Sequence, residues 1–316
     1  MAQLTSAASV DTKHKKSILA RLNKEKELWF LSAIAIVWLI IFAYVPMYGL
    51  IYSFYKYVPG KKLADCKFVG LDNFEAFFRL PDAGMVIRNT LVISGLGLTI
   101  GFVAPIILAL LFDELKNVAF KRVAQTVSYL PYFVSWVVVA SIITSVAGNE
   151  GSLNEALMAF GFIEKPIDFL GEGKYFWALI TIANIWKGIG WSTILYMSAI
   201  AGIDQELYQA GAVDGLGRFG MVWHITLPGI LPTIVLLFVL GCGNILSAGF
   251  EQQLLLGRPT TREYYEVIDT YVYRYGIQLG RYSFATAVGF MKSIIGLVLV
   301  FITNGLSKKL TDMSIL

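Results

Sequence analysis

The chain has 316 residues, of which 56% are hydrophobic and 15% are charged, and its mean hydropathy is +0.64. A soluble domain of this length needs more charged residues to cover its surface, so the composition indicates a membrane protein. The formal net charge of +4 is small and spread along the chain, which argues against nucleic-acid binding.

A polar and basic tail over residues 1–27 comes first. Its positive side chains are Lys13, Lys15, Lys16, Arg21, Lys24 and Lys26. We expect this tail to lie in the cytoplasm, where lysine side chains are attracted to anionic lipid headgroups. The apolar run that follows is too long for the core of a signal peptide and has no small-residue cleavage site behind it. It therefore predicts a first membrane span that is retained.

Apolar stretches recur along the rest of the chain, each close to the roughly 20 residues that a helix needs to cross a bilayer. We predict six spans, over Leu28–Leu50, Asn89–Leu111, Gln125–Ala147, Tyr175–Ala201, Leu227–Leu246 and Ser283–Leu306. Proline and glycine occur inside several of them, which neighbouring helices can tolerate. The predicted fold class is an all-α integral membrane protein with six transmembrane helices, whose transmembrane domain covers residues 28–316.

The positions of the positive charges bear on the orientation of these spans. With the N-terminus inside, the lysine and arginine residues of the loops divide equally between the two sides of the membrane. The basic tail just before the first span and the long outer loops, which dilute their charge, both favour this orientation. We therefore predict a multi-pass protein of the bacterial cell membrane with both termini in the cytoplasm.

Cysteine and histidine are both scarce, with two of each in the chain. The predicted spans place Cys66 outside the membrane and Cys242 within it, so we expect no disulfide. His14 and His224 are far apart in the sequence and lack the spacing of metal ligands, so no zinc site is predicted.

The most informative pattern is a long inner loop over about residues 202–228, between the fourth and fifth predicted spans. It predicts two short amphipathic helices, because Gly215 and Gly217 let the backbone reverse between them. Pro228 is expected to open the fifth span, where a missing N–H costs nothing. Such a helix pair is suited to dock into a groove on a soluble partner. The residues alone also allow an ordinary interfacial loop.

This loop resembles the cytoplasmic coupling motif of ABC importer permeases, in which Glu-Ala-Ala-x-x-x-Gly is followed by Ile-x-Leu-Pro. The chain has Gln209-Ala210-Gly211, then Gly215, then the run Ile225–Pro228. It departs from the family pattern at Gln209, which replaces the acidic residue, and at Gly211, which replaces the second alanine. The first departure affects any salt bridge of the missing glutamate but not the docking geometry.

Other motifs extend the resemblance over nearly the whole chain. The run Phe68–Phe74 is similar to the family's outer-loop signature, and Asn89-Thr90 opens the second span as in the family. Within the binding-protein-dependent inner-membrane component family, the chain resembles the carbohydrate-uptake, maltose-permease-like branch that takes complex oligosaccharides. The runs that carry this are Tyr129–Tyr132, Ile185–Trp191, Ala212–Gly215, Trp223–Pro228 and Val267–Tyr271.

The resemblance implies a permease subunit of an ATP-driven oligosaccharide importer, embedded in membrane lipid. Its implied partners are a second homologous permease, two copies of a cytoplasmic ABC ATPase, and an extracellular or periplasmic sugar-binding protein. The ATPase would bind ATP and Mg²⁺, so this chain is expected to be non-catalytic and to hold no cofactor. Its lack of a glycine-rich P-loop agrees with that. The implied coupling residues are Tyr208, Gln209, Ala210, Gly211, Asp214, Gly215 and Arg218.

Lys187 and Lys292 lie near the middles of the fourth and sixth predicted spans. A lysine at that depth costs roughly 2.5 to 3.5 kcal/mol on insertion scales, so it normally faces a cavity or a partner. Asn184, Lys187 and Trp191 share one helical face, and their amide, cation and indole groups suit a sugar. The alternative for Lys187 is a structural role, bonded to backbone carbonyls at a helix break made plausible by adjacent glycines.

If both lysines face the cavity, few acidic residues in the spans can balance them, and the cargo could be an acidic, uronate-containing oligosaccharide. If they pair with carbonyls or with the partner permease, no such preference follows. Asn244 joins the pathway candidates at the outer end of the fifth span, beside Glu251 and Gln252. Gln253 is expected to begin a solvated loop. The tyrosines of the last outer loop could contact the binding protein or the headgroups; they are Tyr264, Tyr265, Tyr271, Tyr273 and Tyr275.

Two other function classes are alternatives. A stand-alone secondary transporter or channel predicts inverted repeats and paired broken helices, which the sequence does not show. A membrane-embedded enzyme predicts clustered acids, histidines or a nucleophile at one interface, and the sequence offers no such cluster.

Overall fold

The computed structural model describes residues 26–311, so the predicted basic tail lies outside the described residues except for its last two. The chain divides into two compact units, Met1–Ile51 and Tyr52–Leu316. The described part of the first unit is an apolar helix, whose segments are α2 (Lys26–Leu39), the π-helical η1 (Ile40–Tyr44), α3 (Val45–Met47) and the start of the 3-10 helix η2 (Tyr48–Phe54). Its apolar side chains are exposed, as a span within lipid requires.

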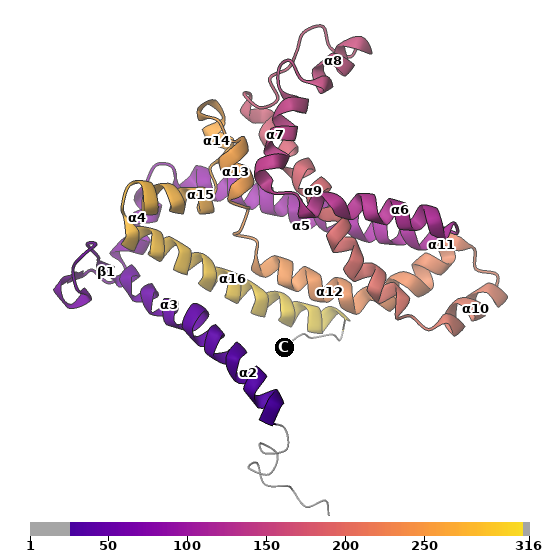
Figure 1. Ribbon diagram of the computed structural model, residues 1–316, viewed down its shortest axis with the longest axis horizontal. Coiled ribbons are helices and arrows are strands. Elements are labelled where there is room, and N and C mark those ends of the chain that lie inside the picture. Colours follow the sequence, from indigo (N-terminus) through magenta and orange to yellow (C-terminus); the bar gives the residue numbers. More distant parts are fainter. Residues whose placement is uncertain (1–25, 312–316) are drawn as a thin grey trace, which may run out of the picture. The chain divides into compact units, whose positions relative to one another are not determined.

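The second unit is mostly helical and is drawn in Figure 1. Its elements are β1 (Tyr55–Lys56), η3 (Leu63–Asp65), β2 (Lys67–Phe68), α4 (Asp72–Arg79), α5 (Ala83–Glu114), α6 (Val118–Tyr129), η4 (Leu130–Phe133), α7 (Trp136–Ala147), α8 (Ser152–Ala159), α9 (Gly173–Ala201), α10 (Gln205–Val213), α11 (Arg218–Met221), η5 (Val222–Thr226), α12 (Leu227–Gly243), α13 (Glu251–Leu256), η6 (Pro259–Thr261), α14 (Arg262–Tyr265), α15 (Ile268–Tyr273), η7 (Arg274–Gln278) and α16 (Tyr282–Thr311). Strands β1 and β2 form a short antiparallel pair, with Tyr55 opposite Phe68. The prediction of a helical membrane fold is confirmed, with this small hairpin added.

Four helical stretches are long and apolar enough to cross a membrane, namely Trp29–Phe54, Ala83–Glu114, Arg218–Gly243 and Tyr282–Lys309. A bent pair, Val118–Phe133 with Trp136–Ala159, would make a fifth. The fourth predicted span is α9, a continuous helix of 29 residues that is not in this group. The hydrophilic residues Asn184 and Lys187 lie within it. Four or five of the six predicted spans are therefore present as candidate spans.

The third predicted span, Gln125–Ala147, is wrong as a single helix. The helices on the two sides of its break are bent by 105°, and α7 leaves α6 steeply in Figure 1. Pro131 lies in the 3-10 turn η4, and Val134 and Ser135 are extended, with ψ of 136° and 152°. The Ser135 hydroxyl then accepts from the Val138 N–H at 3.4 Å and caps α7. Because the helices on both sides of the break are apolar, the hydropathy pattern contains no sign of the bend.

Buried clusters join the long helices. One contains Ile106 of α5, Tyr196 of α9 and Ile230 of α12. A second includes Ile93 of α5, Phe176 of α9 and Val267, which directly precedes α15. Helices α12 and α16 approach closely, since a Cβ added at Gly296 would lie 2.5 Å from the Gly243 carbonyl oxygen. Both cysteines of the chain are free and buried.

Candidate translocation pathway and coupling segment

The break between η4 and α7 opens a polar hollow of about 430 Å³ against α9. Its polar and aromatic lining residues are Tyr132, Ser135, Trp136, Asn184, Lys187 and Glu251. Two of the residues predicted to share a face of α9, Asn184 and Lys187, are thus brought to one space. The lining combines an amide, two hydroxyls, an ammonium group, a carboxylate and two aromatic rings, which are groups that can bind a sugar.

Lys187 is held at this break by backbone oxygens. Its ammonium donates to the Tyr132 carbonyl at 2.7 Å and to the Pro131 carbonyl at 3.4 Å. It also lies 5.4 Å and 5.7 Å from the ring centroids of Tyr132 and Trp136, within cation–π range. The alternative structural role, in which Lys187 binds backbone carbonyls at a helix break, is therefore present. The break, however, lies between α6 and α7 and not in α9. An ammonium has three donors, so two carbonyls leave one for a ligand in the hollow.

Trp191 lies about one turn further along α9 and adds an aromatic surface. Its ring stacks on that of Tyr132 with centroids 4.6 Å apart and planes within 6°. Trp191 is 44% exposed, and the Phe133 ring also packs against it, with centroids 6.3 Å apart. Trp191 does not line the hollow of Asn184 and Lys187, but it contacts Tyr132, which does.

A second polar hollow, of about 380 Å³, shares Asn184 with the first. Ser94 of α5, Asn244 at the end of α12 and Gln252 of α13 also line it. The Gln252 amide lies 3.4 Å from the Asn184 side-chain oxygen, and the Asn244 amide donates to the Leu240 carbonyl at 3.1 Å. Asn184 and Asn244, predicted from separate spans, therefore line one continuous polar region.

The prediction that Lys292 adds an unpaired positive charge to the cavity is wrong. Its ammonium forms an ion pair with the Asp269 carboxylate, and the two side chains are 20% and 24% exposed. Lys292 does reach a hollow of about 360 Å³ that Asn244 and Ser247 also line. The neutralising aspartate was missed because it lies on α15, in the last outer loop, and not in a span.

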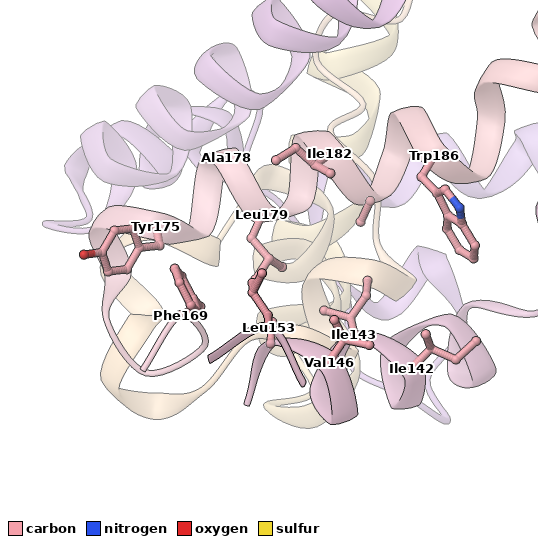
Figure 2. A pocket seen from close by; sticks show the side chains of 12 residues that line it. Ile142, Ile143, Val146, Leu153, Phe169, Tyr175, Ala178, Leu179, Ile182 and Trp186 are labelled. Carbon is pink, nitrogen blue, oxygen red and sulfur yellow. The ribbon is translucent and has the colours of Figure 1, made fainter. Parts of the chain in front are cut away.

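An apolar hollow of about 380 Å³ lies between α7 and α9. Figure 2 shows its lining, in which Ile142, Val146, Leu179 and Ile182 are typical members. Hydrocarbon side chains cannot satisfy the hydroxyls of a sugar. The polar hollows, and not this one, are the candidate pathway.

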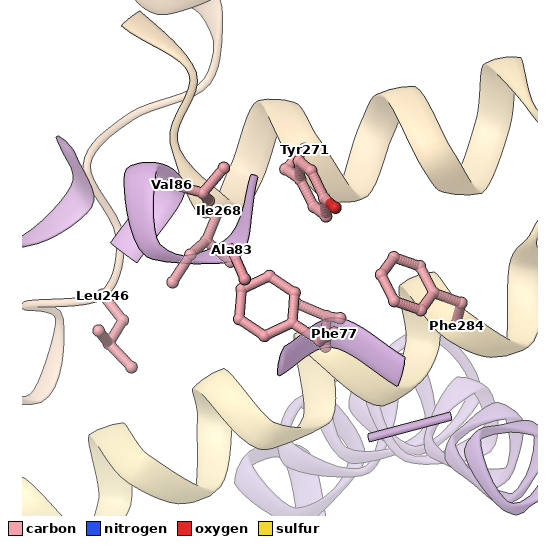
Figure 3. Close-up of a cluster of buried hydrophobic side chains, with 8 residues drawn as sticks. Phe77, Ala83, Val86, Leu246, Ile268, Tyr271 and Phe284 are labelled. Carbon is pink, nitrogen blue, oxygen red and sulfur yellow. The ribbon is translucent and has the colours of Figure 1, made fainter. Parts of the chain in front are cut away.

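The outer segment over residues 251–281 is packed against the protein more closely than the sequence suggests. Gln253, predicted to be solvated, is fully buried and donates to the Ala248 carbonyl at 3.2 Å. Tyr271 lies in the buried cluster of Figure 3, with its ring centroid 5.7 Å from that of Phe77 and 6.2 Å from that of Phe284. Burial raises the pKa of the Tyr271 hydroxyl. Neither the binding protein nor the headgroups can reach Tyr271, so both expectations are wrong for this residue.

Two further tyrosines of this segment also face inward. The Tyr264 ring packs on Trp177 at 5.4 Å between centroids, and Tyr265 packs on Phe176 at 6.1 Å. The Trp177 indole donates to the Tyr264 carbonyl at 3.0 Å. These contacts fix the outer segment on the first turns of α9.

A charged network fastens the same segment to the start of α5. Glu266, whose side chain is 2% exposed, accepts from Arg262 at 2.9 Å and pairs with Arg274 at 3.0 Å. Arg262 also binds Asp82 at 2.7 Å. Burial by itself lowers the pKa of Arg262, but its bonds to Glu266 and Asp82 outweigh this and raise it. Sequence reasoning missed this network, although Arg262 and Glu266 are only four residues apart, because Asp82 lies 180 residues from Arg262.

The Asn89-Thr90 motif has a structural role at this junction. Asn89 is fully buried and donates to the Glu263 and Glu266 carbonyls at 2.9 Å and 3.0 Å. The Thr90 hydroxyl accepts from the Ile268 N–H at 3.0 Å. Both residues satisfy backbone groups of the outer segment that secondary structure leaves unpaired.

Of the predicted pair of short helices in the coupling loop, only α10 is a separate short helix, because α11 is the first turn of the continuous stretch Arg218–Gly243. Asp204 caps α10 by accepting from the Glu206 N–H at 2.9 Å, and Gly215 ends it with φ of +78°. Pro228 does not open a span, because Arg218–Gly243 is one continuous helical stretch. The π-helical η5 directly precedes α12, and a wide turn there relieves the clash of the proline ring with the preceding turn.

Most of the predicted coupling residues lie on the surface, together with apolar side chains. Phe219 is 93% exposed and Val213 88%. Gln209, Ala210, Asp214, Gly215 and Arg218 are exposed, and Tyr208 is half-buried. Gly211 is different. It is buried, and a Cβ there would lie 2.8 Å from the Ile225 side chain, so it faces the inside of the loop.

Comparison with known proteins decides what kind of protein contains these features. The family described as binding-protein-dependent transport system inner membrane component matches residues 68–312. The chain belongs to this family. The inner-membrane location and the transport role follow from membership, and the alternatives of a channel or an enzyme are set aside. The predicted resemblance to this family is thereby confirmed.

Relatives of this permease include two proteins of Bacillus subtilis (strain 168). It is 41% identical to Protein LplB over 93% of this chain and 92% of the relative. It is 40% identical to the polygalacturonan/rhamnogalacturonan transport system permease protein YteP, with the same coverage of both chains at 93% and 92%.

Solved structures give the same result. The permease resembles a chain of a bacterial alginate ABC transporter, solved in complex with an alginate pentasaccharide-bound periplasmic protein, with a TM-score of 0.85 and 36% identity. The match covers 94% of this chain and 99% of the other. A second chain, from an ABC transporter that imports the acidic polysaccharide alginate, has a TM-score of 0.83 and 37% identity. At these values both the fold and the family relationship are shared.

Proposed function

We propose that this permease is one of two homologous permease subunits in an ATP-driven importer of acidic oligosaccharides. Two copies of a cytoplasmic ABC ATPase would bind ATP and Mg²⁺ and hydrolyse ATP, while an extracellular or periplasmic binding protein delivers the sugar. The single observation that carries the cargo class is the match at 37% identity to a transporter of an acidic polysaccharide. The relationship to YteP, whose name includes polygalacturonan, supports the same class.

The polar hollows support this cargo chemically. Amides of Asn184, Asn244 and Gln252 can exchange hydrogen bonds with sugar hydroxyls. Lys187 supplies a positive charge for a carboxylate in the hollow that Glu251 also lines, whereas Asp269 already neutralises Lys292. At an effective dielectric of about 20, a charge pair 4 Å apart gains roughly 4 kcal/mol before desolvation is subtracted.

Replacing Lys187 by methionine is expected to reduce the preference for acidic cargo by about tenfold, which corresponds to roughly 1.4 kcal/mol. The measurement is ATPase stimulation of the whole complex by uronate and neutral oligosaccharides of equal length. Lys292→Met is the matched control, because it removes a lysine at similar depth whose charge is already paired. Equal stimulation of the wild type by neutral sugars, or an unchanged preference in Lys187→Met, would contradict the proposed role of Lys187.

We further propose six spans with both termini and α10–α11 in the cytoplasm. Cysteine reporters at Asp72 and Phe162 should then be labelled from outside in intact cells, and one at Asp214 should not. All three positions are exposed, whereas Cys66 and Cys242 are buried, so background labelling is expected to be low. Labelling at Asp214 from outside would reverse the topology and remove the coupling role.

A further inference from the structure

We infer that the hydrogen bond between Tyr208 and Thr226, together with the close packing at Gly211, transmits movement of α10 to α12. This contact is called the Tyr208–Thr226 link. The inference rests on the proposed function, because α10 has to be the helix that the ATPase moves. Tyr208 and Thr226 are assigned here as positioning residues of the transport cycle, since they act through α12 and not on the cargo.

The two hydroxyl groups of the link form a hydrogen bond in which either can be the donor. The Tyr208 hydroxyl oxygen is 3.0 Å from the Thr226 hydroxyl oxygen. Thr226 also donates to the Met221 carbonyl, at 3.4 Å. A threonine hydroxyl has one proton, so Thr226 cannot donate in both bonds at once. Thr226 is 2% exposed, and the loss of this bond would leave a buried hydroxyl with one partner fewer.

Packing reinforces the hydrogen bond. Gly211 follows Tyr208 by three residues and therefore lies on the same face of α10. A Cβ at Gly211 would approach Ile225 at 2.8 Å and Met221 at 3.0 Å. Ile225 directly precedes Thr226 in η5. The inner face of α10 thus contacts one turn of η5 both through a hydroxyl pair and through close van der Waals contact.

The turn that α10 contacts continues without interruption into α12. Arg218–Gly243 is a single helical stretch, and α12 alone has 17 residues, or roughly 25 Å at 1.5 Å per residue. Its far end is capped by Asn244, which lines the polar hollow. A displacement of α10 by the ATPase can therefore reach the pathway as a movement of one continuous helix.

Three substitutions separate this role from a general contribution to folding. Thr226→Val keeps the shape of the side chain and removes the hydroxyl, whereas Thr226→Ser keeps the hydroxyl and removes the methyl group. Tyr208→Phe removes the hydroxyl from the other side. If the link transmits movement, Thr226→Val and Tyr208→Phe share one defect, and Thr226→Ser restores the wild-type behaviour.

The experiment uses the complete transporter in proteoliposomes, with its binding protein and an imported oligosaccharide, and measures ATP hydrolysed per sugar imported. We expect this ratio to rise about fivefold in Thr226→Val and in Tyr208→Phe, in the range that one buried hydrogen bond controls. The ratio in the double variant should be no higher than in either single variant, because both substitutions remove the same hydrogen bond. Melting temperatures of the purified complexes should differ by little. An unchanged ratio in both variants, or a ratio in Thr226→Ser as high as in Thr226→Val, overturns the inference.

A crosslink distinguishes this result from a failure of the proposed function. A cysteine at Val213, which is 88% exposed on α10, should crosslink to the ATPase in the wild type and in every variant. If the crosslink forms in every variant and the ratio of ATP hydrolysed to sugar imported stays constant, the inferred role of the Tyr208–Thr226 link is wrong. The coupling role of α10 is then retained. If no crosslink forms even in the wild-type background, both are wrong.

Discussion

Replacing Gly215 by valine is expected to abolish sugar-stimulated ATP turnover while the protein still reaches the membrane. The backbone at Gly215 has φ of +78°, a region that β-branched residues rarely adopt. No atom lies within 4 Å of a Cβ built there, so the penalty is backbone strain and not a clash. Such strain costs about 1 to 3 kcal/mol. The chain would relieve it by reorienting α10 relative to α11.

Two control variants make this result specific. Gly217→Val introduces the same side chain two residues away, where φ is −75° and the space around a Cβ is also open. It should retain most activity, because valine adopts that conformation freely. Gly215→Asn should also retain activity, since asparagine tolerates the left-handed region. Normal uptake by Gly215→Val, or equal loss in Gly217→Val, would show that the turn does not set the position of α10.

Replacing Glu266 by glutamine is expected to lower the stability of the permease by about 3 kcal/mol, at the low end of the range for breaking a buried charge pair. The low end applies because Arg262 and Arg274, which lose their carboxylate, are 40% and 27% exposed. The outer segment should detach first from α5. The measurement is the melting temperature of the purified complex, with proteolysis of the outer segment as a local readout.

Asp72→Asn is the matched control for the charge that is removed. Asp72 pairs with Arg79 at 3.4 Å, and the two side chains are 64% and 65% exposed. An exposed pair contributes at most about 1 kcal/mol, so the melting temperature should change little. A loss of stability in Asp72→Asn as large as in Glu266→Gln would indicate a general effect of charge, and would contradict the assignment of Glu266 as the centre of a buried network.

The long apolar helices could be predicted from the sequence, because every helix that lies in lipid must present apolar side chains to it. The predicted spans Asn89–Leu111 and Ser283–Leu306 lie inside α5 and α16. The coupling loop was readable for another reason, since Gly215 and the Ile225–Pro228 run carry a local pattern. Local geometry, such as the positive φ at Gly215, follows from residues that are neighbours in the chain.

The break in the third predicted span was not readable in the same way. Pro131 is compatible with a kinked membrane helix as well as with a 105° bend. What holds the bend is the contact with another helix, in which Lys187 of α9 binds the Tyr132 carbonyl at 2.7 Å. The sequence identified Lys187 as unusual, but the partner that explains its position lies 55 residues away.

By itself, then, the sequence determined the membrane class, the extent of most long helices, the family and the turn at Gly215. Each of these depends on composition or on residues close together in the chain. Only the tertiary structure decided which charges are free. It paired Lys292 with Asp269 and buried Gln253. Burial and ion pairing depend on which distant segments of the chain come into contact. An outer loop that folds back onto the helices has no periodic pattern of residues from which this packing could be predicted.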